Sequence, residues 1–452
     1  MLINPSQVSK KLAALGFEDL AAQCGLDNSN VHKISPFFLV LSFFHCFGQG
    51  NVSLQSWANS LMELFQVSVS KQAIDKRLSG FRYLDFCREL FNRVLKQNYS
   101  EGHLAMLANY QARAKHSSIP SLFNRVLIQD SSCIKLLSGC EQFFPGAHSS
   151  KGPSATAKVQ LTMDLVSDQP IDILLTHFCK NDQGDAKRIV EQLQPKDLLI
   201  RDMGYFVNEA FGLITQAEAF FLSRLKSGVK IYQAGSSTPV DLLKLCQQSS
   251  KRGITQFDGY FELGRRERLP VRLIICQLSQ SCYQTRRRKA LKDRSSKANH
   301  SKRYLKMLQW QLLITNAEQE VLPIAQAVKL YRLRWRVEII FKCWKSGTEL
   351  NRLFTKKQSM KPTRCEITLY LLLIDLLLFG YNTFWRVRKA VYEQHGRFLS
   401  ALKWFKFIKS CTSLEPDQLL SQNMIQHFAR ACCYEKRRRK SHAELLYVNL
   451  SG

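Results

Sequence analysis

One carboxylate stands in a run of basic and apolar residues, YRLRWRVEIIFKCWK, which covers residues 331–345. On a helix that turns by about 100° per residue, an arc of about 80° contains the polar members of this run: Tyr331, Arg334, Glu338, Lys342 and Lys345. A solvated basic face would explain the arginines and lysines, but it would not explain an acid aligned with them. The pattern therefore favours a site in which Glu338 lies among cations that need a negatively charged target.

A second arc of the same expected helix is apolar. It consists of Leu333, Val337, Ile340, Phe341 and Trp344. Because an amphipathic helix buries its apolar side against the core, we expect this arc to anchor the helix on a sheet. The polar arc then stays available for chemistry.

Two further acids stand where apolar, strand-like runs end. Asp130 ends the run VLIQD, and Asp202 ends LLIRD, which a Met-Gly-Tyr turn follows. In phosphoryl transfer, two metal ions about 3.5–4 Å apart can activate the attacking oxygen and stabilise the leaving one. Mg²⁺ prefers carboxylate oxygens. The candidate metal ligands are therefore Asp130, Asp202 and Glu338.

Three other acids compete for this role. Asp164 lies in QLTMDL, and Asp168 and Asp172 lie in the connection between two expected strands. A lone aspartate at a strand end is more often a turn cap than a metal ligand. Two strand-end acids together with the helix of Glu338 favour the metal interpretation.

These residues resemble the signature of a known family. The spacing Y-x2-R-x3-E-x6-K, at Tyr331, Arg334, Glu338 and Lys345, is similar to that of cut-and-paste DDE transposases of the insertion-sequence-4 family. Asp130 and Asp202 stand where the two aspartates of that family would be. The long interval between Asp202 and Glu338 also fits, because that branch carries a β-rich insertion there. The resemblance covers roughly residues 120–350.

The resemblance implies an α/β fold, a ribonuclease-H-like mixed sheet flanked by helices. Asp130, Asp202 and Glu338 would hold two Mg²⁺ ions, with Mn²⁺ as a substitute. The ions would activate water to cut the transposon ends and then direct the freed 3′-hydroxyls at target DNA, without a covalent protein intermediate. Because two ends must be brought together, the family also implies a homodimer on double-stranded DNA.

The resemblance further implies DNA contacts. Tyr331, Arg334 and Lys345 would bind phosphates around the cut, with Lys342 on the same helix face. Arg224, in FFLSRLK, resembles a family arginine that contacts phosphate. Trp310 stands where relatives stack a flipped base while the DNA end closes into a hairpin. The alternative for Trp310 is a core tryptophan on a buried strand.

Composition points to a polyanionic partner. The chain has 65 Lys and Arg against 36 Asp and Glu, a formal charge of +29. Such an excess opposes a compact state unless a polyanion compensates it, and nucleic acid is the commonest one. A basic protein without such a partner is the alternative. Two clusters are candidates for phosphate contact: the basic arm (Arg286, Arg287, Arg288, Lys289, Lys292, Arg294) and the segment EKRRRK at 435–440. A basic run in the position of the arm is most often a solvated loop, which is the alternative to contact with a phosphate backbone.

The first ~115 residues show helical apolar stripes. The segment LQSWANSLMELFQVSVSKQAIDKRLSGF resembles two helices joined by a short turn, with Ser70 as the cap of the second. Lys71, Lys76 and Arg77 would then be available to phosphates or base edges. An ordinary helical hairpin is the alternative.

From residue 123 the pattern changes to strands at 123–137, 157–168 and 170–182, then a helix at 185–194, a strand at 197–202 and a helix at 206–220. Alternating elements of this kind predict a mixed sheet with helices packed on it. We expect five regions. A helical region that binds the DNA ends (1–115) is followed by the first part of the catalytic core (116–226) and by a β-rich insertion with the basic arm (227–309). The second part of the catalytic core (310–385) and a helical C-terminal region for dimerisation or DNA contact (386–452) complete the chain.

We expect the protein in the bacterial cytoplasm, in association with the nucleoid. The first seventeen residues support this expectation, because they lack the apolar segment of a secretory signal. Residues 367–379 are strongly apolar but short for a membrane span, and Asp375 interrupts them, so we expect a buried core helix and no membrane. The fourteen cysteines contain no CxxC pair, which favours reduced thiols.

Three functions remain compatible with the sequence. The first is an active Mg²⁺-dependent transposase. The second is a catalytically inactive or domesticated descendant that only binds DNA, and the third is a nuclease of the same fold that cuts but never joins. The second predicts DNA binding with a steep dependence on salt but no metal-dependent cutting.

Overall fold

A computed structural model of the chain describes residues 5–26, 34–48, 53–111, 122–137, 139–147, 154–295, 299–347, 361–410 and 418–435. Contacts divide the chain into two units. The first unit contains Met1–Arg113, Ser131–Cys179 and Arg336–Val448. The second contains Ala114–Asp130, Lys180–Trp335 and Asn449–Gly452. Each is described separately below. The basic segment at 436–440 lies outside the described residues.

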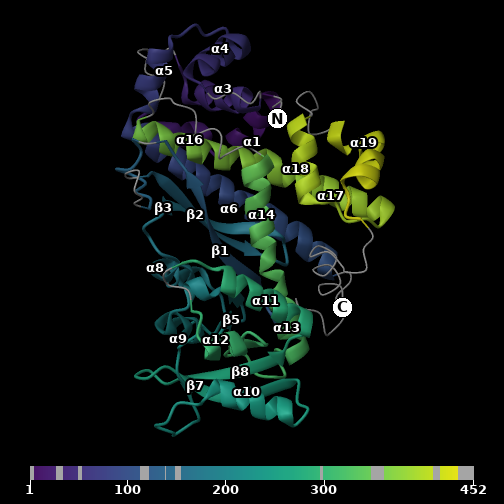
Figure 1. The fold of residues 1–452 in the computed structure, drawn as a ribbon. Helices are drawn as coiled ribbons and strands as arrows, with labels where there is room; N and C mark the ends of the chain where they lie inside the picture. The colour runs from purple at the N-terminus through teal and green to yellow at the C-terminus, as the bar shows by residue number, and fades with distance from the viewer. Residues whose placement is uncertain are drawn as a thin grey trace. The chain divides into compact units, whose positions relative to one another are not determined.

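In the described part of the first unit, the helices that come first in the chain are α1 (Pro5–Ala14), α2 (Phe17–Gln23), α3 (Pro36–Gly48), α4 (Leu54–Phe65), α5 (Lys71–Leu78) and α6 (Phe81–Gln111). Its strands are β2 (Thr156–Asp164) and β3 (Gln169–His177), which pair antiparallel. The long α6 packs against β3 and against α16 (Pro362–Asp375), as Figure 1 shows. The remaining elements are α14 (Trp335–Gly347), η3 (Leu376–Tyr381), α17 (Asn382–His395), α18 (Ala401–Ser410), η4 (Gln418–Leu420), α19 (Gln422–His427) and η5 (Phe428–Cys432).

The helix pair expected in the N-terminal region is confirmed as α4 and α5. The hydroxyl of Ser70 caps α5 by accepting a hydrogen bond from the Ala73 amide at 3.2 Å. Ile74 and Leu78 are buried, whereas Lys71 and Lys76 are exposed. One side of α5 therefore packs inward while the other presents lysines to solvent.

The apolar stretch that raised the membrane question is a core helix of the first unit. Pro362–His395 is long and apolar enough to cross a membrane, with a mean hydropathy of 1.7 in its most apolar 18-residue window. All of that window is buried inside the protein. This burial favours the expected core helix over a membrane span.

Asp375 at the end of α16 is a buried carboxyl group. It is 1% exposed, and neither of its carboxylate oxygens has a hydrogen-bond partner among the described residues. Burial raises the pKa of Asp375 to about 7, because the charged form is poorly solvated there. The proton is therefore bound more tightly in the folded chain than in the unfolded one.

Replacing Asp375 with asparagine should flatten the pH dependence of stability. The folded pKa lies above the unfolded value of about 3.9, so this group makes stability fall as pH rises from about 4 to about 7. Relative to Asp375→Asn, the wild type should lose several degrees of melting temperature across that window. Circular dichroism melting at several pH values measures this difference. Glu393→Gln on α17, at an exposed site, is the control; equal curves for wild type and Asp375→Asn would contradict the expectation.

The sheet contains nine strands in the order β3-β2-β1-β4-β5-β9-β8-β7-β6. The other strands are β1 (Val126–Lys135), β4 (Leu198–Arg201), β5 (Phe220–Arg224), β6 (Ile231–Tyr232), β7 (Gln256–Leu263), β8 (Leu269–Gln277) and β9 (Trp310–Thr315). β1, β4 and β5 are parallel, and β5, β9, β8, β7 and β6 pair antiparallel in turn. The predicted mixed sheet with helices is confirmed.

The second unit also contains α8 (Asp182–Asp185), η1 (Arg188–Gln192), η2 (Met203–Tyr205), α9 (Asn208–Gln216), α10 (Leu242–Lys251), α11 (Gln280–Lys292), α12 (Lys302–Met307) and α13 (Ile324–Leu333). Two expectations differ from this structure. In place of the helix predicted over 185–194, the chain forms the 3-10 helix η1 (Arg188–Gln192), and its backbone becomes extended at Leu193, shortly before Pro195. The basic arm is largely helical, since α11 contains all of its members except Arg294.

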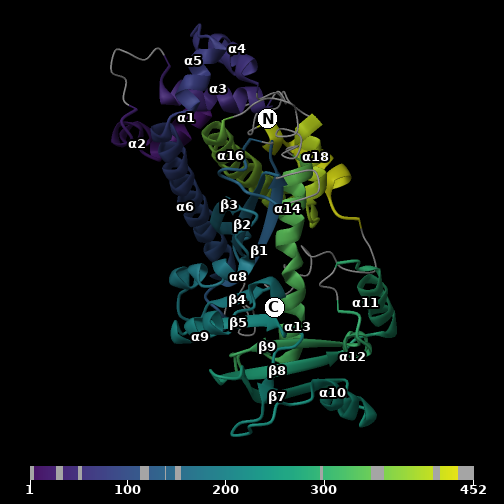
Figure 2. The same ribbon diagram turned by 60° about the vertical axis from the view of Figure 1, so that its left-hand side comes forward.

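The segment 227–309, predicted as an insertion, adds β6, β7 and β8 to the sheet, and a buried arginine joins β8 to β7 and to the chain that follows β9. Arg272 on β8 is 1% exposed and donates to both carboxylate oxygens of Asp258 on β7, at 2.8 and 2.7 Å. It also donates to the carbonyls of Ala317 and Leu322, at 3.0 and 2.8 Å. Figure 2 shows β7, β8 and β9 side by side, with α10 next to β7. The strands that carry α11 are therefore well fixed.

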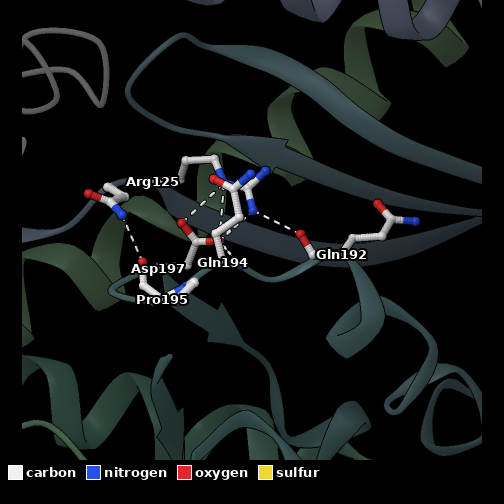
Figure 3. A network of polar contacts seen from close by, with 6 residues as sticks. Arg125, Gln192, Gln194, Pro195 and Asp197 are labelled. Atoms are coloured by element: carbon white, nitrogen blue, oxygen red, sulfur yellow. Dashed lines mark hydrogen bonds and ion pairs between the residues drawn. The ribbon is translucent and has the colours of Figure 1, made fainter. Parts of the chain in front are cut away.

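A second buried ion pair joins the starts of β1 and β4 (Figure 3). Arg125 donates from Nε to both oxygens of Asp197 at 3.1 Å, and its Nη2 donates to the Gln192 carbonyl at 2.8 Å. The Gln194 amide donates to Asp197 Oδ2 at 2.7 Å. Both charges are buried and satisfied by several hydrogen bonds, so this pair helps to fix how β1 lies against β4.

Candidate active site

Three neighbouring parallel strands share one register where β4 and β5 end; β1 continues past this point to Lys135, so Asp130 lies inside its strand and not at the strand end that the sequence predicted. Gln129 on β1 pairs with Arg201 on β4, which pairs with Ser223 on β5. The residues that follow on the three strands therefore form a row: Asp130, Asp202 and Arg224. Residues in register on parallel strands point to the same face, and adjacent strands lie about 4.8 Å apart. The second unit thus brings both predicted aspartates and the predicted arginine together.

The two aspartates have different partners. Asp130 Oδ2 accepts a hydrogen bond from Arg334 Nη1 at 2.9 Å, and the arginine is 5% exposed. Asp202 Oδ1 accepts from the Met203 amide at 2.7 Å, which holds it at the turn after β4. The ion pair shows that Arg334 positions Asp130, a role that the sequence analysis did not assign to it.

Tyr331 lies among the same groups. Burial raises the pKa of its hydroxyl to about 12; the charge of Asp202 acts in the same direction, while Arg334 and Arg224 oppose it. The hydroxyl therefore stays protonated at neutral pH. Such a group can donate a hydrogen bond to a phosphate oxygen but is a poor nucleophile.

The rival acids have structural partners in the first unit. Asp164 accepts hydrogen bonds from the Val166 amide at 3.0 Å and from the Ser167 hydroxyl at 2.7 Å, so it acts as a turn cap. Asp168 pairs with Arg336 at 2.7 Å and with Arg388. Burial opposes ionisation of Asp168, but these two arginines hold its pKa below the usual value.

The remaining residues of the helix signature belong to the first unit. Glu338 lies in the first turn of α14, which begins at Trp335, directly after Arg334. All members of the predicted apolar arc are buried, as expected. Lys342 is exposed, and Lys345 lines an apolar hollow with Trp344, where burial lowers the pKa of the lysine.

Trp310 begins β9 and is 6% exposed. Arg224 pairs with Leu313, and the alternation of side chains along a strand places Trp310 on the face opposite to Arg224. Stacking of a flipped base on this ring would require it to leave its buried position. The structure thus favours the alternative of a core tryptophan, and base stacking stays a prediction.

A buried polar layer lies behind the row, and the sequence analysis did not identify it. Gln129 donates to Asp185 at 3.0 Å, and Arg201 donates to the Ala186 carbonyl at 2.7 Å. Burial lowers the pKa of Arg201 to about 10. The Tyr205 amide donates to the Asp202 carbonyl at 3.1 Å and so closes the turn after β4. The sequence did contain a signal for this layer, because Arg201 is an arginine inside an apolar run, directly before Asp202.

Whether these residues fit a divalent ion depends on which atoms could coordinate it. Among the described residues, no three His, Cys, Asp or Glu side chains are grouped as a metal site. Asp130 and Asp202 nevertheless supply hard oxygen donors from one row, as Mg²⁺ requires. A cation bound by Asp130 would compete with Arg334 for its oxygen. The two aspartates therefore fit such an ion in ligand type.

Two acids and an arginine in one row of a mixed sheet, in a strongly basic chain, are typical of proteins that act on phosphate esters of nucleic acid. Comparison with known proteins makes this specific. Residues 121–374 match the family described as the transposase DDE domain, so the chain belongs to the DDE transposase family.

Individual relatives agree with this assignment. The chain is 27% identical over 353 residues to the transposase for insertion sequence element IS231F of Bacillus thuringiensis subsp. israelensis, which covers 74% of this chain and 70% of the relative. It is 27% identical to that of IS231B of B. thuringiensis subsp. berliner, over 83% and 78%. It is 26% identical to that of IS1151 of Clostridium perfringens, over 81% and 77%. The resemblance drawn from the sequence motifs is confirmed.

Proposed function

We propose that the protein is an insertion-sequence transposase that binds the ends of its element, cleaves DNA there and transfers the freed 3′-hydroxyls into target DNA. The observation that carries this proposal is the row of Asp130, Asp202 and Arg224. It combines two hard anionic donors with a phosphate-binding cation at one edge of the sheet. The proposal takes the sheet as a ribonuclease-H-like core.

Asp130, Asp202 and Glu338 would hold two Mg²⁺ ions in this proposal. When bound, the ions would supply Lewis-acid activation of the attacking oxygen and charge stabilisation at the leaving oxygen. The chain itself binds and orients the DNA. Arg224 would contact a phosphate oxygen, and the protonated hydroxyl of Tyr331 would donate to another.

Before a metal binds, Arg334 neutralises Asp130 and keeps it in place. If Asp130 bound a cation through that oxygen, the guanidinium of Arg334 could turn to a phosphate, which suits its paired donors. Lys342 and Lys345 would add point charges from α14. This change of partner explains how Arg334 can position Asp130 in the free protein and bind the DNA substrate in the complex.

End recognition is proposed for the N-terminal helices, where the exposed lysines of α5 face solvent and α4 supports the helix from inside. A homodimer would bring two ends together, and a hairpin on the cleaved end would require Trp310 to move. The protein would work in the bacterial cytoplasm, at the nucleoid.

One incubation tests the proposal. Purified protein is mixed with linear DNA carrying the element's end and with a plasmid target, with and without Mg²⁺ or Mn²⁺. An active transposase gives cut ends and joined products only with metal. End binding without cutting would instead indicate an inactive descendant, and cutting without joining would indicate a nuclease.

A further inference from the structure

The insertion returns to the edge of the sheet that carries the row of Asp130, Asp202 and Arg224. β9 runs antiparallel to β5, and β8 runs antiparallel to β9, so the ends of β5 and β8 and the start of β9 lie at one edge. Gln277 at the end of β8 pairs with Trp310 at the start of β9. Because α11 begins only three residues after β8, its first turns lie near this edge.

Arg286 differs from its neighbours on α11. No residue of this helix is fully buried, and Arg287 and Arg288 are exposed, but Arg286 is half-buried. Its Nη1 donates to the Trp310 carbonyl at 3.4 Å, a long hydrogen bond. The side chain therefore points back toward the sheet, while the other arginines of the basic arm point outward.

The surroundings of Arg286 are cationic. Burial lowers the pKa of its guanidinium, and Arg224 is the next cause in the same direction. The groups that act in the opposite direction are Cys282, Tyr331 and Tyr304, and none of them is a carboxylate. Geometry places the two arginines in the same part of the sheet: Arg224 pairs with Leu313 on β9, three residues along the strand from Trp310, whose carbonyl Arg286 contacts.

Neither Arg286 nor Arg224 forms an ion pair with a carboxylate among the described residues. Like charges that are partly desolvated raise the free energy of the folded state unless an anion offsets them. Buried ion pairs elsewhere in this unit, such as Arg272 with Asp258 and Arg125 with Asp197, do have their anions. Among the described residues, Arg286 and Arg224 therefore differ from these two arginines in having no carboxylate partner.

We propose that Arg286 and Arg224 form a phosphate subsite that binds a single backbone phosphodiester of the DNA close to the bond that is cut. A phosphate carries the charge that the two arginines lack, and guanidinium donors bind its oxygens in pairs. The proposal rests on the proposed function. It assigns to Arg286, in the segment 227–309, a contact with one DNA phosphate beside the reacting groups. This contact is separate from the general attraction between DNA and the exposed basic residues.

The test replaces one DNA charge at a time. End DNA is prepared with a single uncharged methylphosphonate at successive positions around the cut, and dissociation constants are measured without divalent metal, so that no cleavage occurs. For the wild type, one position should weaken binding by about tenfold, the size of a good charged contact. For Arg286→Gln, the loss at that position should shrink to about twofold or less.

Arg287→Gln is the matched control, because it removes the same charge one residue away from an exposed site. It should weaken binding to every DNA by a similar small factor and retain the position-specific loss. Arg286→Lys keeps the charge but not the paired donors, so it should restore part of the loss.

Melting temperature separates this role from a structural one. If Arg286 mainly supported the fold through the Trp310 carbonyl, Arg286→Gln would lower the melting temperature by several degrees. Under the proposal, the melting temperature stays the same or rises, because repulsion from Arg224 is relieved. A wild-type position-specific loss that persists in Arg286→Gln would overturn the subsite and leave the proposed function intact. A wild type that does not bind end DNA would overturn both.

Discussion

Glu338→Gln should abolish cleavage of end DNA, with a loss of at least about a thousandfold, typical of removing an essential active-site group. The amide keeps the size of the side chain but cannot supply the negative oxygen that a divalent ion needs. Affinity for end DNA should stay within about threefold, because end recognition is proposed for α5 and its neighbours. Cleavage of labelled end DNA and a binding titration, both with Mg²⁺ present, measure the two effects.

Glu209→Gln provides the control for this experiment. Glu209 lies in the first turn of α9 and pairs with Lys187 at an exposed site, so the change removes one negative charge without touching the row of acids. It should cleave at the wild-type rate. If Glu338→Gln also cleaved normally, Glu338 would have no part in the reaction, and the third ligand would have to be sought elsewhere.

The strand-end position of Asp202 could be predicted from the sequence because its signal is local: a short apolar run becomes a buried parallel strand. Asp130 ends a similar apolar run, but the polar residues after it continue β1 to Lys135, so the predicted strand end was wrong there. The common register of the two strands could not be predicted. A shift of β4 by one residue would turn Asp202 to the other face of the sheet, and nothing in the two runs fixes that alignment.

The partners of the arginines could not be predicted either. Arg334 pairs with an aspartate 204 residues away, and Arg336 with one 168 residues away. In the sequence both look like members of one cationic helix run. In the folded protein, Arg336 neutralises Asp168 inside the first unit, so part of the charge in this run serves the fold. Contacts of such separation depend on the whole topology.

The basic arm illustrates a different limit. A charge run between strands suggested a solvated loop, but Arg, Lys, Leu and Ala are all good helix formers, and α11 follows from their propensity. The inward orientation of Arg286 depends on where β8 meets β9. The amphipathic arc of α14, in contrast, was predictable, because helical periodicity depends only on the spacing of neighbouring residues in the sequence.

The largest effect on stability is expected at the other end of the strands that carry the acids. Asp197→Asn should lower the free energy of unfolding by about 3–5 kcal/mol, the cost of leaving a buried charge without its partner. Asp197 is fully buried, and the change would leave the Arg125 guanidinium and the Gln194 amide without an anionic acceptor. Urea denaturation followed by circular dichroism measures the loss.

Asp241→Asn is the matched comparison, because Asp241 also pairs with an arginine, Arg303, but at an exposed site. Asparagine can still cap α10, and an exposed pair contributes less than about 1 kcal/mol, so this variant should be nearly as stable as the wild type. Equal losses of stability for the two variants would contradict the explanation by burial.

Because the Arg125–Asp197 pair joins the starts of β1 and β4, Asp197→Asn should also loosen the alignment that places Asp130 beside Asp202. We therefore expect its cleavage rate per folded molecule to fall as well, whereas that of Asp241→Asn stays unchanged.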